Sequence, residues 1–144
     1  MSLRSLSPGI SHSTRLLVTD DLTVPEVSDS LTAFSVMPRV FATAYMVAFA
    51  EAACIECIAP YRAEDEHTVG TYVDINHVAA TPPGMEICAE VCLVEAAGRT
   101  LTFDVTLRDD LEIIGRGRHQ RAVISRSRFE CNVQKKAENA VSSG

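Results

Sequence analysis

Three polar side chains within largely apolar segments have the chemistry that acyl transfer needs. Thr43 and Glu51 lie in the stretch Val40 to Tyr61, and His77 ends an alternating segment further along the chain. A hydroxyl, a carboxylate and an imidazole can together activate water and move its proton, with the carboxylate fixing the imidazole tautomer or acting directly. The spacing is not specific by itself, because a lone histidine at such a position is more often a satisfied core residue.

Glu51 is the residue that most needs an explanation. An ionised carboxylate in the middle of an apolar helix is costly unless something compensates it. It is either a working carboxylate or a structural one, paired with an arginine in a core or at a subunit interface. A membrane span is the third interpretation, and it is disfavoured because a central acidic residue costs roughly 3 kcal/mol on insertion.

Other residues are candidates for substrate contacts. Gly70 lacks a side chain and could let a backbone N–H approach a developing oxyanion, although a bulge or a close backbone contact explains it equally well. Phe34 and Met37 are apolar points in the loop-like segment Pro25 to Pro38, and they either cover a pocket or anchor the loop. Five arginines crowd one late segment, as an anion site or as a solvated strand face: Arg116, Arg118, Arg121, Arg126 and Arg128.

Composition places the chain among ordinary globular proteins. Its 144 residues suit one domain, and a net charge of −6 argues against general nucleic-acid binding. The start of the chain is polar and lacks the apolar core of a secretory signal, so we expect reduced thiols, a cytoplasmic setting and no membrane partner. Cys54 and Cys57 have zinc-like spacing, but they fall inside the apolar helix, which favours buried thiols. We expect no metal and no cofactor.

These residues must be positioned by one helix and a sheet. Val40 to Tyr61 reads as a helix apolar on every side, which Pro60 ends. Alternating segments joined by tight turns read as strands. A strand also fits Arg15 to Val24, and the others are Val69–Val78, Met85–Leu93, Leu101–Leu107 and Ile113–Ser125. The fold class is therefore α+β, with an antiparallel sheet curled around a central helix. A helix buried on all sides needs a second subunit as further cover.

We expect the domain to span residues 15–129. A loose arm, residues 1–14, precedes it, and a polar, frayed tail, residues 130–144, follows it.

Three segments resemble a known family. VFATAYMVAFAEAAC, VGTYVDINHVAATPPG and GRGRHQRAVI are similar to the fluoroacetyl-CoA thioesterase family of hot-dog-fold proteins. The resemblance implies a hot-dog fold, a homodimer with its sites at the interface, and an acyl-CoA substrate. It also implies that Thr43, Glu51 and His77 form the active site, that Gly70 faces the acyl group, and that Arg121 contacts the pocket or CoA.

The chain departs from the family at the lid and on the helix. Phe34 matches the first lid phenylalanine, whereas Met37 stands at the second and Tyr45 replaces a phenylalanine. A flexible thioether and an added hydroxyl suit a different short acyl group. We therefore expect a thioesterase for a short acyl-CoA, fluoroacetyl-like or otherwise. The alternatives are a non-catalytic acyl-CoA-binding module and, with less support, a hydratase of the same fold.

Overall fold

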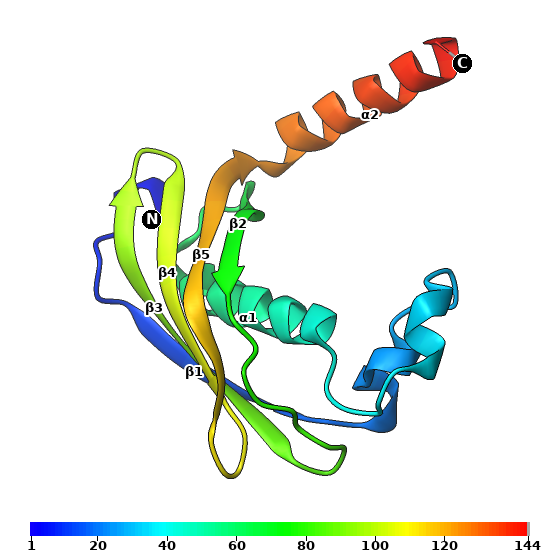
Figure 1. Cartoon of the computed structure of the whole chain (residues 1–144). Coiled ribbons are helices and arrows are strands. Elements are labelled where there is room, and N and C mark those ends of the chain that lie inside the picture. The colour runs from blue at the N-terminus through cyan, green and yellow to red at the C-terminus, as the bar shows by residue number, and fades with distance from the viewer. Residues whose placement is uncertain (144) are drawn as a thin grey trace.

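The computed structural model describes residues 1–143 and shows a long helix lying in the hollow of a curled sheet (Figure 1). The helix α1 spans Thr43–Ile58, and Pro60 falls in the 3-10 turn Ala59–Tyr61 that follows. The sheet has the order β1-β3-β4-β5-β2 with antiparallel neighbours. Its strands are β1 (Ser11–Leu17), β2 (Glu66–Ile75), β3 (Glu86–Ala97), β4 (Thr100–Arg108) and β5 (Ile113–Ser125). The α+β prediction, with four strands after the helix, is confirmed.

The core lies between α1 and the concave face of the sheet. Alternate residues of β3 and β4 are buried there, among them Ile87, Leu93 and Phe103. Ala50 and Ala53 of α1 are fully buried, and their small side chains let the helix approach the sheet closely. Burying a Leu, Ile or Phe side chain contributes about 1.5–3 kcal/mol, so this layer fixes where α1 lies.

The sheet covers only one side of α1, so the expected burial on every side is not reached within one chain and would need the second subunit. Ala44, Ala48 and Ala52 are exposed, and Ile55 keeps 44% of its accessible surface. Thr43–Tyr61 is long and apolar enough to cross a membrane by length and composition, a test that core helices of soluble proteins also pass. Seven α1 residues are buried against the sheet side. The exposed side is therefore an apolar surface that one chain leaves uncovered.

A β-bulge in β2 decides which of its residues face the helix. The register with β5 shifts between Gly70 and Tyr72, so Thr71 is an extra residue. Strict alternation would place Gly70 and Ile75 on opposite faces, yet Gly70 faces Glu51 of α1 and Ile75 packs on the core. The simple period-two interpretation of this strand was wrong at this point, because one inserted residue reverses the alternation.

The first residues of the chain differ from a loose arm. Leu3 lies in a 3-10 helix, Leu3–Ser5, and is 1% exposed. Its backbone N–H donates to the Glu66 carboxylate at 2.9 Å, and the Ser2 hydroxyl donates to the same group at 2.7 Å. Strand β1 begins earlier than expected and ends at Leu17, because its seven residues pair with β3.

Three 3-10 turns follow β1 where part of a strand was expected. They span Asp20–Leu22, Val24–Glu26 and Thr32–Val36, and they lie beyond the N-terminal end of α1 (Figure 1). The Thr23 hydroxyl donates to the Asp20 carbonyl at 2.7 Å, which closes the first turn. The Arg39 guanidinium binds Asp20 and Glu26 at 3.0 and 3.1 Å and ties the ends of the segment together.

The C-terminal residues form a helix, α2 (Arg126–Ser143), where a frayed tail was expected. It extends away from the sheet after β5 (Figure 1). The Asp65 carboxylate accepts from the Ser127 N–H at 3.2 Å, and this caps the first turn. Arg126 and Glu130 form an i, i+4 ion pair at 2.8 Å. Lys, Glu, Gln and Ala then favour helix along its length. Gly144 lies outside the described residues.

Candidate active site

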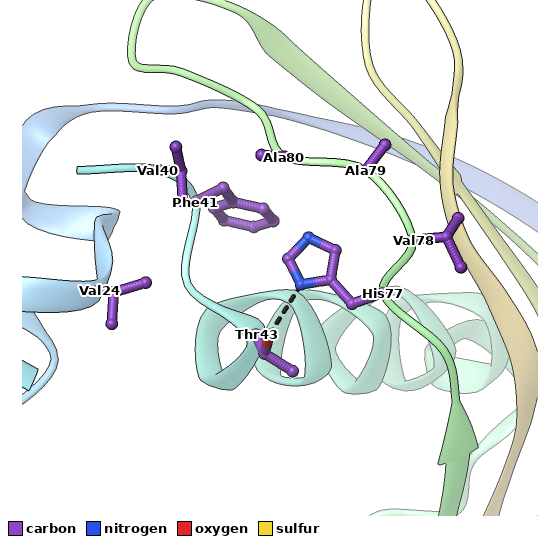
Figure 2. Close-up of a pocket in the computed structure, with 8 residues that line it drawn as sticks. All are labelled: Val24, Val40, Phe41, Thr43, His77, Val78, Ala79 and Ala80. Carbon is purple, nitrogen blue, oxygen red and sulfur yellow. Dashed lines mark hydrogen bonds between the residues drawn. The ribbon is translucent and has the colours of Figure 1, made fainter. Parts of the chain in front are cut away.

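Thr43 and His77 meet at the N-terminal end of α1. Thr43 is the first residue of the helix, and His77 follows the end of β2. Thr43 Oγ1 and His77 Nδ1 are 2.7 Å apart, a hydrogen bond that joins the helix to the segment after the strand (Figure 2). The structure thus brings together two of the three residues that the sequence indicated for acyl transfer.

The second nitrogen of His77 has no partner in the described part of the chain. Nε2 is buried and makes no hydrogen bond. A buried polar atom left in this way costs about 1–3 kcal/mol, and such atoms often mark the place of a ligand or a reacting group. Burial is the largest cause acting on the pKa of His77 and lowers it, while the nearby Ala79 backbone acts in the opposite direction. The net lowering of the pKa keeps the ring neutral at pH 7 and able to exchange a proton.

A small cavity opens beside this pair. Its volume is about 310 Å³, near the lower end for small-molecule sites. The walls are mostly apolar, and Figure 2 shows the lining residues: Val24, Val40, Phe41, Thr43, His77, Val78, Ala79 and Ala80. Phe34 and Met37 are not among them; Phe34 is half-buried and Met37 is 45% exposed. The segment before α1 reaches the cavity through Val24 and Val40 instead.

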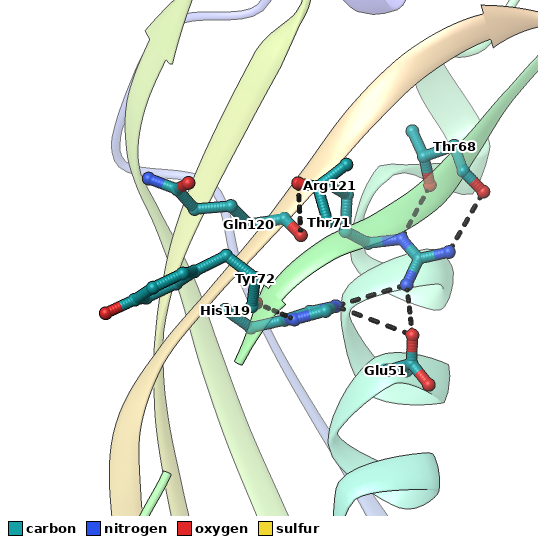
Figure 3. A network of polar contacts seen from close by, with 7 residues as sticks. All are labelled: Glu51, Thr68, Thr71, Tyr72, His119, Gln120 and Arg121. Carbon is teal, nitrogen blue, oxygen red and sulfur yellow. Dashed lines mark hydrogen bonds and ion pairs between the residues drawn. The ribbon is translucent and has the colours of Figure 1, made fainter. Parts of the chain in front are cut away.

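Glu51 lies two helical turns further along α1 and has a different partner from the one expected. Its Oε1 accepts from Arg121 Nη1 at 3.0 Å, and its side chain is 37% exposed (Figure 3). No hydrogen bond joins it to Thr43 or His77 within residues 1–143. The expectation that the imidazole meets this carboxylate was therefore wrong for the single chain. Pairing with an arginine, the structural alternative, is what the geometry shows.

Gly70 stands directly over this carboxylate. A Cβ added at Gly70 would collide with Glu51 Oε1 and would lie 3.3 Å from His119 Cε1 and 3.4 Å from Arg121 Nη1. Only a residue without a side chain leaves the carboxylate where Arg121 holds it. Gly70 also lies opposite Arg121 in the β2–β5 register, which the bulge after it interrupts.

Of the five late arginines, Arg121 is the one in the site. Arg121 is 4% exposed, and its neighbours at alternate positions point inward with it. Arg116 and Arg118 lie at the intervening positions of β5, so their side chains point to the other face of the sheet. Arg118 pairs there with Asp104 at 3.0 Å. The solvated strand face is therefore confirmed for Arg118. Arg126 is exposed too, but it belongs to α2, where it pairs with Glu130, and not to the strand.

His119 is a site residue that the sequence analysis missed. It is fully buried, and it lies next to both Glu51 and Arg121 (Figure 3). Its Nε2 is 3.1 Å from Arg121 Nη1 and 3.9 Å from Glu51 Oε1. The signal was present in GRGRHQRAVI, because His119 and Arg121 are two apart on one strand and must share a face.

Cys54 and Cys57 do not form a metal site in this structure. Cys54 and Cys57 are free and buried, and burial raises the pKa of Cys54 to about 12 and that of Cys57 to about 11. Thiols in this state are poor metal ligands, because the thiolate is the binding form. Across residues 1–143, no cluster of three or more His, Cys, Asp or Glu side chains could hold a metal ion.

Comparisons with known proteins identify the family and the fold. The family model described as fluoroacetyl-CoA-specific thioesterase matches residues 18–127. A fluoroacetyl-CoA thioesterase from Streptantibioticus cattleyicolor is 40% identical over 103 residues, 72% of this chain and 74% of the relative. A variant of a fluoroacetyl-CoA thioesterase solved with acetyl-CoA is 34% identical with a TM-score of 0.89, covering 91% of this chain and 98% of that chain. A hot-dog-like protein from Thermanaerovibrio acidaminovorans is 18% identical with a TM-score of 0.77, covering 91% and 93% of the two chains, and shows the fold alone.

Helix, curled sheet and polar site together define a thioester hydrolase of the hot-dog fold. The chain belongs to the fluoroacetyl-CoA-specific thioesterase family.

Proposed function

We propose that this protein hydrolyses a short acyl-CoA to the free acid and CoA. The observation that supports this most directly is the orphaned His77 Nε2, buried beside Thr43 at the wall of a small apolar cavity. In the reaction, an oxygen bonds to the thioester carbonyl carbon, the C–S bond breaks, and the sulfur leaves with a proton as free CoA. His77 is placed to carry that proton, and Thr43 holds its ring through Nδ1.

Glu51 supplies the second centre of the reaction. As base it takes the proton of the attacking water, and as nucleophile it attacks the carbonyl carbon itself, with water then releasing the acid. Its Oε1 is held by Arg121, which leaves Oε2 for either role. The carbonyl carbon and the sulfur of a thioester are adjacent atoms, so both centres must act at one place. In a single chain they are roughly 12 Å apart along the axis of α1, and the proposal therefore requires a second copy against the exposed side of the helix to bring a Glu51 and a His77 to the same thioester.

The cavity and the segment before α1 favour a short acyl group. A cavity of about 310 Å³ is near the lower end for small-molecule sites, which favours a short acyl group. Phe34 and Met37 do not line the cavity in one chain, but we keep them as proposed lid residues because the same segment carries the lining residues Val24 and Val40. The thioether of Met37 would tolerate more than one small acyl group. A fluoroacetyl group is one such group, and acetyl and propionyl groups are others.

The proposal includes a homodimer working in the cytoplasm, apart from membranes and nucleic acid. The uncovered apolar side of α1 and the unpaired edge of β2 both favour a second copy, which would also enclose Glu51. Tyr72 and Val73 on that edge strand are 49% and 44% exposed. The five free cysteines fit a reducing compartment.

A substrate panel tests the function. Release of free thiol would be followed with acetyl-, fluoroacetyl-, propionyl-, hexanoyl- and palmitoyl-CoA, using wild type and His77→Ala. We expect turnover of the short esters, little with palmitoyl-CoA, and a loss of about 10²-fold or more in kcat for the variant. Binding of these esters without thiol release would instead select a non-catalytic acyl-CoA-binding module, and would overturn the proposal.

A further inference from the structure

The mechanism above gives no role to His119, a buried histidine beside the Glu51–Arg121 pair. His119 has no exposed surface, and it lies behind the Glu51–Arg121 pair, on the side away from solvent. Burial is the main cause that lowers the pKa of His119. The Tyr72 carbonyl and the Glu51 charge oppose it, the Arg121 charge adds to it, and the net lowering of the pKa leaves the ring neutral at pH 7. A neutral histidine in this position has one donor and one acceptor nitrogen.

The neighbours of His119 decide which nitrogen carries the proton. Nδ1 is 2.8 Å from the Tyr72 carbonyl oxygen, which can only accept. Nε2 is 3.1 Å from Arg121 Nη1, which can only donate. Both bonds form together only when Nδ1 carries the hydrogen and Nε2 keeps its lone pair. The Tyr72 carbonyl belongs to the bulge in β2, so the bulge fixes this tautomer.

The acceptor on His119 completes the set of bonds that aims Arg121. Nε of Arg121 donates to Thr68 Oγ1 at 2.7 Å, and Nη2 donates to the Thr68 carbonyl at 2.9 Å. Nη1 donates to His119 and to Glu51 Oε1. The guanidinium is planar and rigid, so the two bonds to Thr68 fix one of its edges, and the bond to His119 fixes the tilt of the plane about that edge. This tilt sets where Nη1 meets the carboxylate.

We propose that His119 is a positioning residue for thioester hydrolysis: its Nε2 lone pair holds Arg121 so that the Glu51 carboxylate keeps one orientation. The inference rests on the proposed function. His119 does not touch the substrate, and it acts through Arg121. Its loss lowers kcat, because Glu51 is then less often in the reactive orientation, and it leaves KM close to the wild-type value.

Two substitutions by amide side chains test this role, because each keeps only one of the two hydrogen bonds of His119. In His119→Gln the side-chain oxygen reaches the place of Nε2 and can still accept from Arg121. In His119→Asn the amide reaches only the place of Nδ1, so it can donate to the Tyr72 carbonyl but offers nothing to Arg121. We expect kcat of the Gln variant within about threefold of wild type and kcat of the Asn variant lower by about 10- to 100-fold. A merely structural role, which works through Tyr72, predicts the reverse order.

A double variant shows whether the loss of kcat in His119→Asn passes through Arg121. Arg121→Met removes the guanidinium, and in that background His119→Asn should cause no further loss of kcat. Independent losses that multiply would contradict the proposal. Urea unfolding of each variant checks that the compared proteins are folded.

The tautomer can be read without any substrate. Nitrogen-15 chemical shifts of the wild-type imidazoles should show His119 neutral and protonated on Nδ1 at pH 7, and a proton on Nε2 would overturn the inference. If wild type releases no thiol from any acyl-CoA, the proposed function fails, and this measurement still decides the arrangement of His119. If wild type is active while Asn and Gln variants are equally active, the inference alone fails.

Discussion

At the scale of residues, α1 carries two unlike polar centres. Thr43 and His77 form one neutral bond beside an apolar cavity and leave Nε2 unsatisfied. Glu51 is an anion whose charge is matched by Arg121. His77 Nε2 is free to bind the substrate, whereas the Glu51 carboxylate is held in one orientation by Arg121. Substitutions around His77 should therefore affect contacts with the substrate, and substitutions around Glu51 should affect the orientation of its carboxylate.

Gly70→Ala tests the space above Glu51. The new Cβ would push Oε1, which is the end of a flexible, half-exposed side chain, so the carboxylate moves while the fold adapts. We expect the free energy of unfolding to stay within about 1 kcal/mol of wild type, while kcat for a short acyl-CoA falls by about tenfold or more. Urea unfolding and thiol release on one preparation measure both. Unchanged activity would mean that Glu51 does not need its present position.

Half-buried His77 and fully buried His119 predict a dependence of stability on pH. Burial lowers the pKa of His77 and of His119 below the ordinary value of 6.5, so the unfolded chain binds protons that the folded chain does not. The free energy of unfolding should therefore fall as pH drops below about 6.5, and it should rise towards a plateau above that value. Carboxylates with a lowered pKa, such as Asp109, add a separate loss of stability below about pH 4.

Urea unfolding between pH 5 and pH 8 measures the histidine contribution. His119→Gln removes one of the two titrating groups and should flatten the dependence. A stability that stays constant or increases as pH falls from 6.5 to 5 would contradict the assignment of two rings that are neutral in the folded chain.

The sequence predicted residues better than it predicted their pairings. The Thr43–His77 pair follows from a helix start and a strand end that must pack together, and it was found. The Glu51–Arg121 contact depends on the register of β2 with β5, which one bulge at Thr71 changes, so the partner of Glu51 could not be deduced from spacing. His119 was missed although its parity with Arg121 placed it on the same face.

At the scale of elements, the ends of a helix or strand are set by its contacts with other elements where the local composition does not define them. The helix was predicted well, because apolar content and Pro60 mark it locally. Strand β1 was misplaced, since its limits are set by hydrogen bonds to β3 rather than by its own residues. Helix α2 was missed, because its stability depends on a cap from Asp65, some sixty residues earlier.

Gly117→Ala tests the close approach of β5 to β2. An added Cβ would collide with the Asp74 carbonyl oxygen and would lie 2.7 Å from the Ile75 Cα, and backbone atoms cannot move aside cheaply. We expect a loss of about 1–3 kcal/mol in the free energy of unfolding. Arg116→Ala, an exposed change on the same strand, should stay within about 0.5 kcal/mol. Equal stabilities for the two variants would contradict this packing.

At the scale of the whole molecule, the uncovered side of α1 and the open edge of β2 are the features that one chain does not explain. Ala48 and Ala52 lie on that side, and small residues permit close approach of a second helix or sheet. Glu51 is 37% exposed from the same direction. A second copy placed there would complete the site as well as cover the apolar surface.

Ala48→Arg tests this assembly. Arginine is tolerated at an exposed helical position of a single chain, and it prevents another chain from packing closely there. We expect wild type to sediment as a dimer and the variant as a folded monomer with little thioesterase activity. Leu111→Arg, at a residue 78% exposed in the turn between β4 and β5, adds the same charge and should leave the dimer intact. A monomeric, active wild type would contradict the proposal.

Two carboxylates on α1 allow the most direct test of the account. Glu51 faces Gly70 and Arg121, whereas Glu56 is exposed and pairs with His12 at 2.9 Å. Glu51→Gln and Glu56→Gln make the same chemical change on one helix, and thiol release from a short acyl-CoA compares them. The account predicts that kcat falls by about 10²-fold or more for Glu51→Gln and stays near wild type for Glu56→Gln. Turnover by Glu51→Gln at the wild-type rate would contradict it.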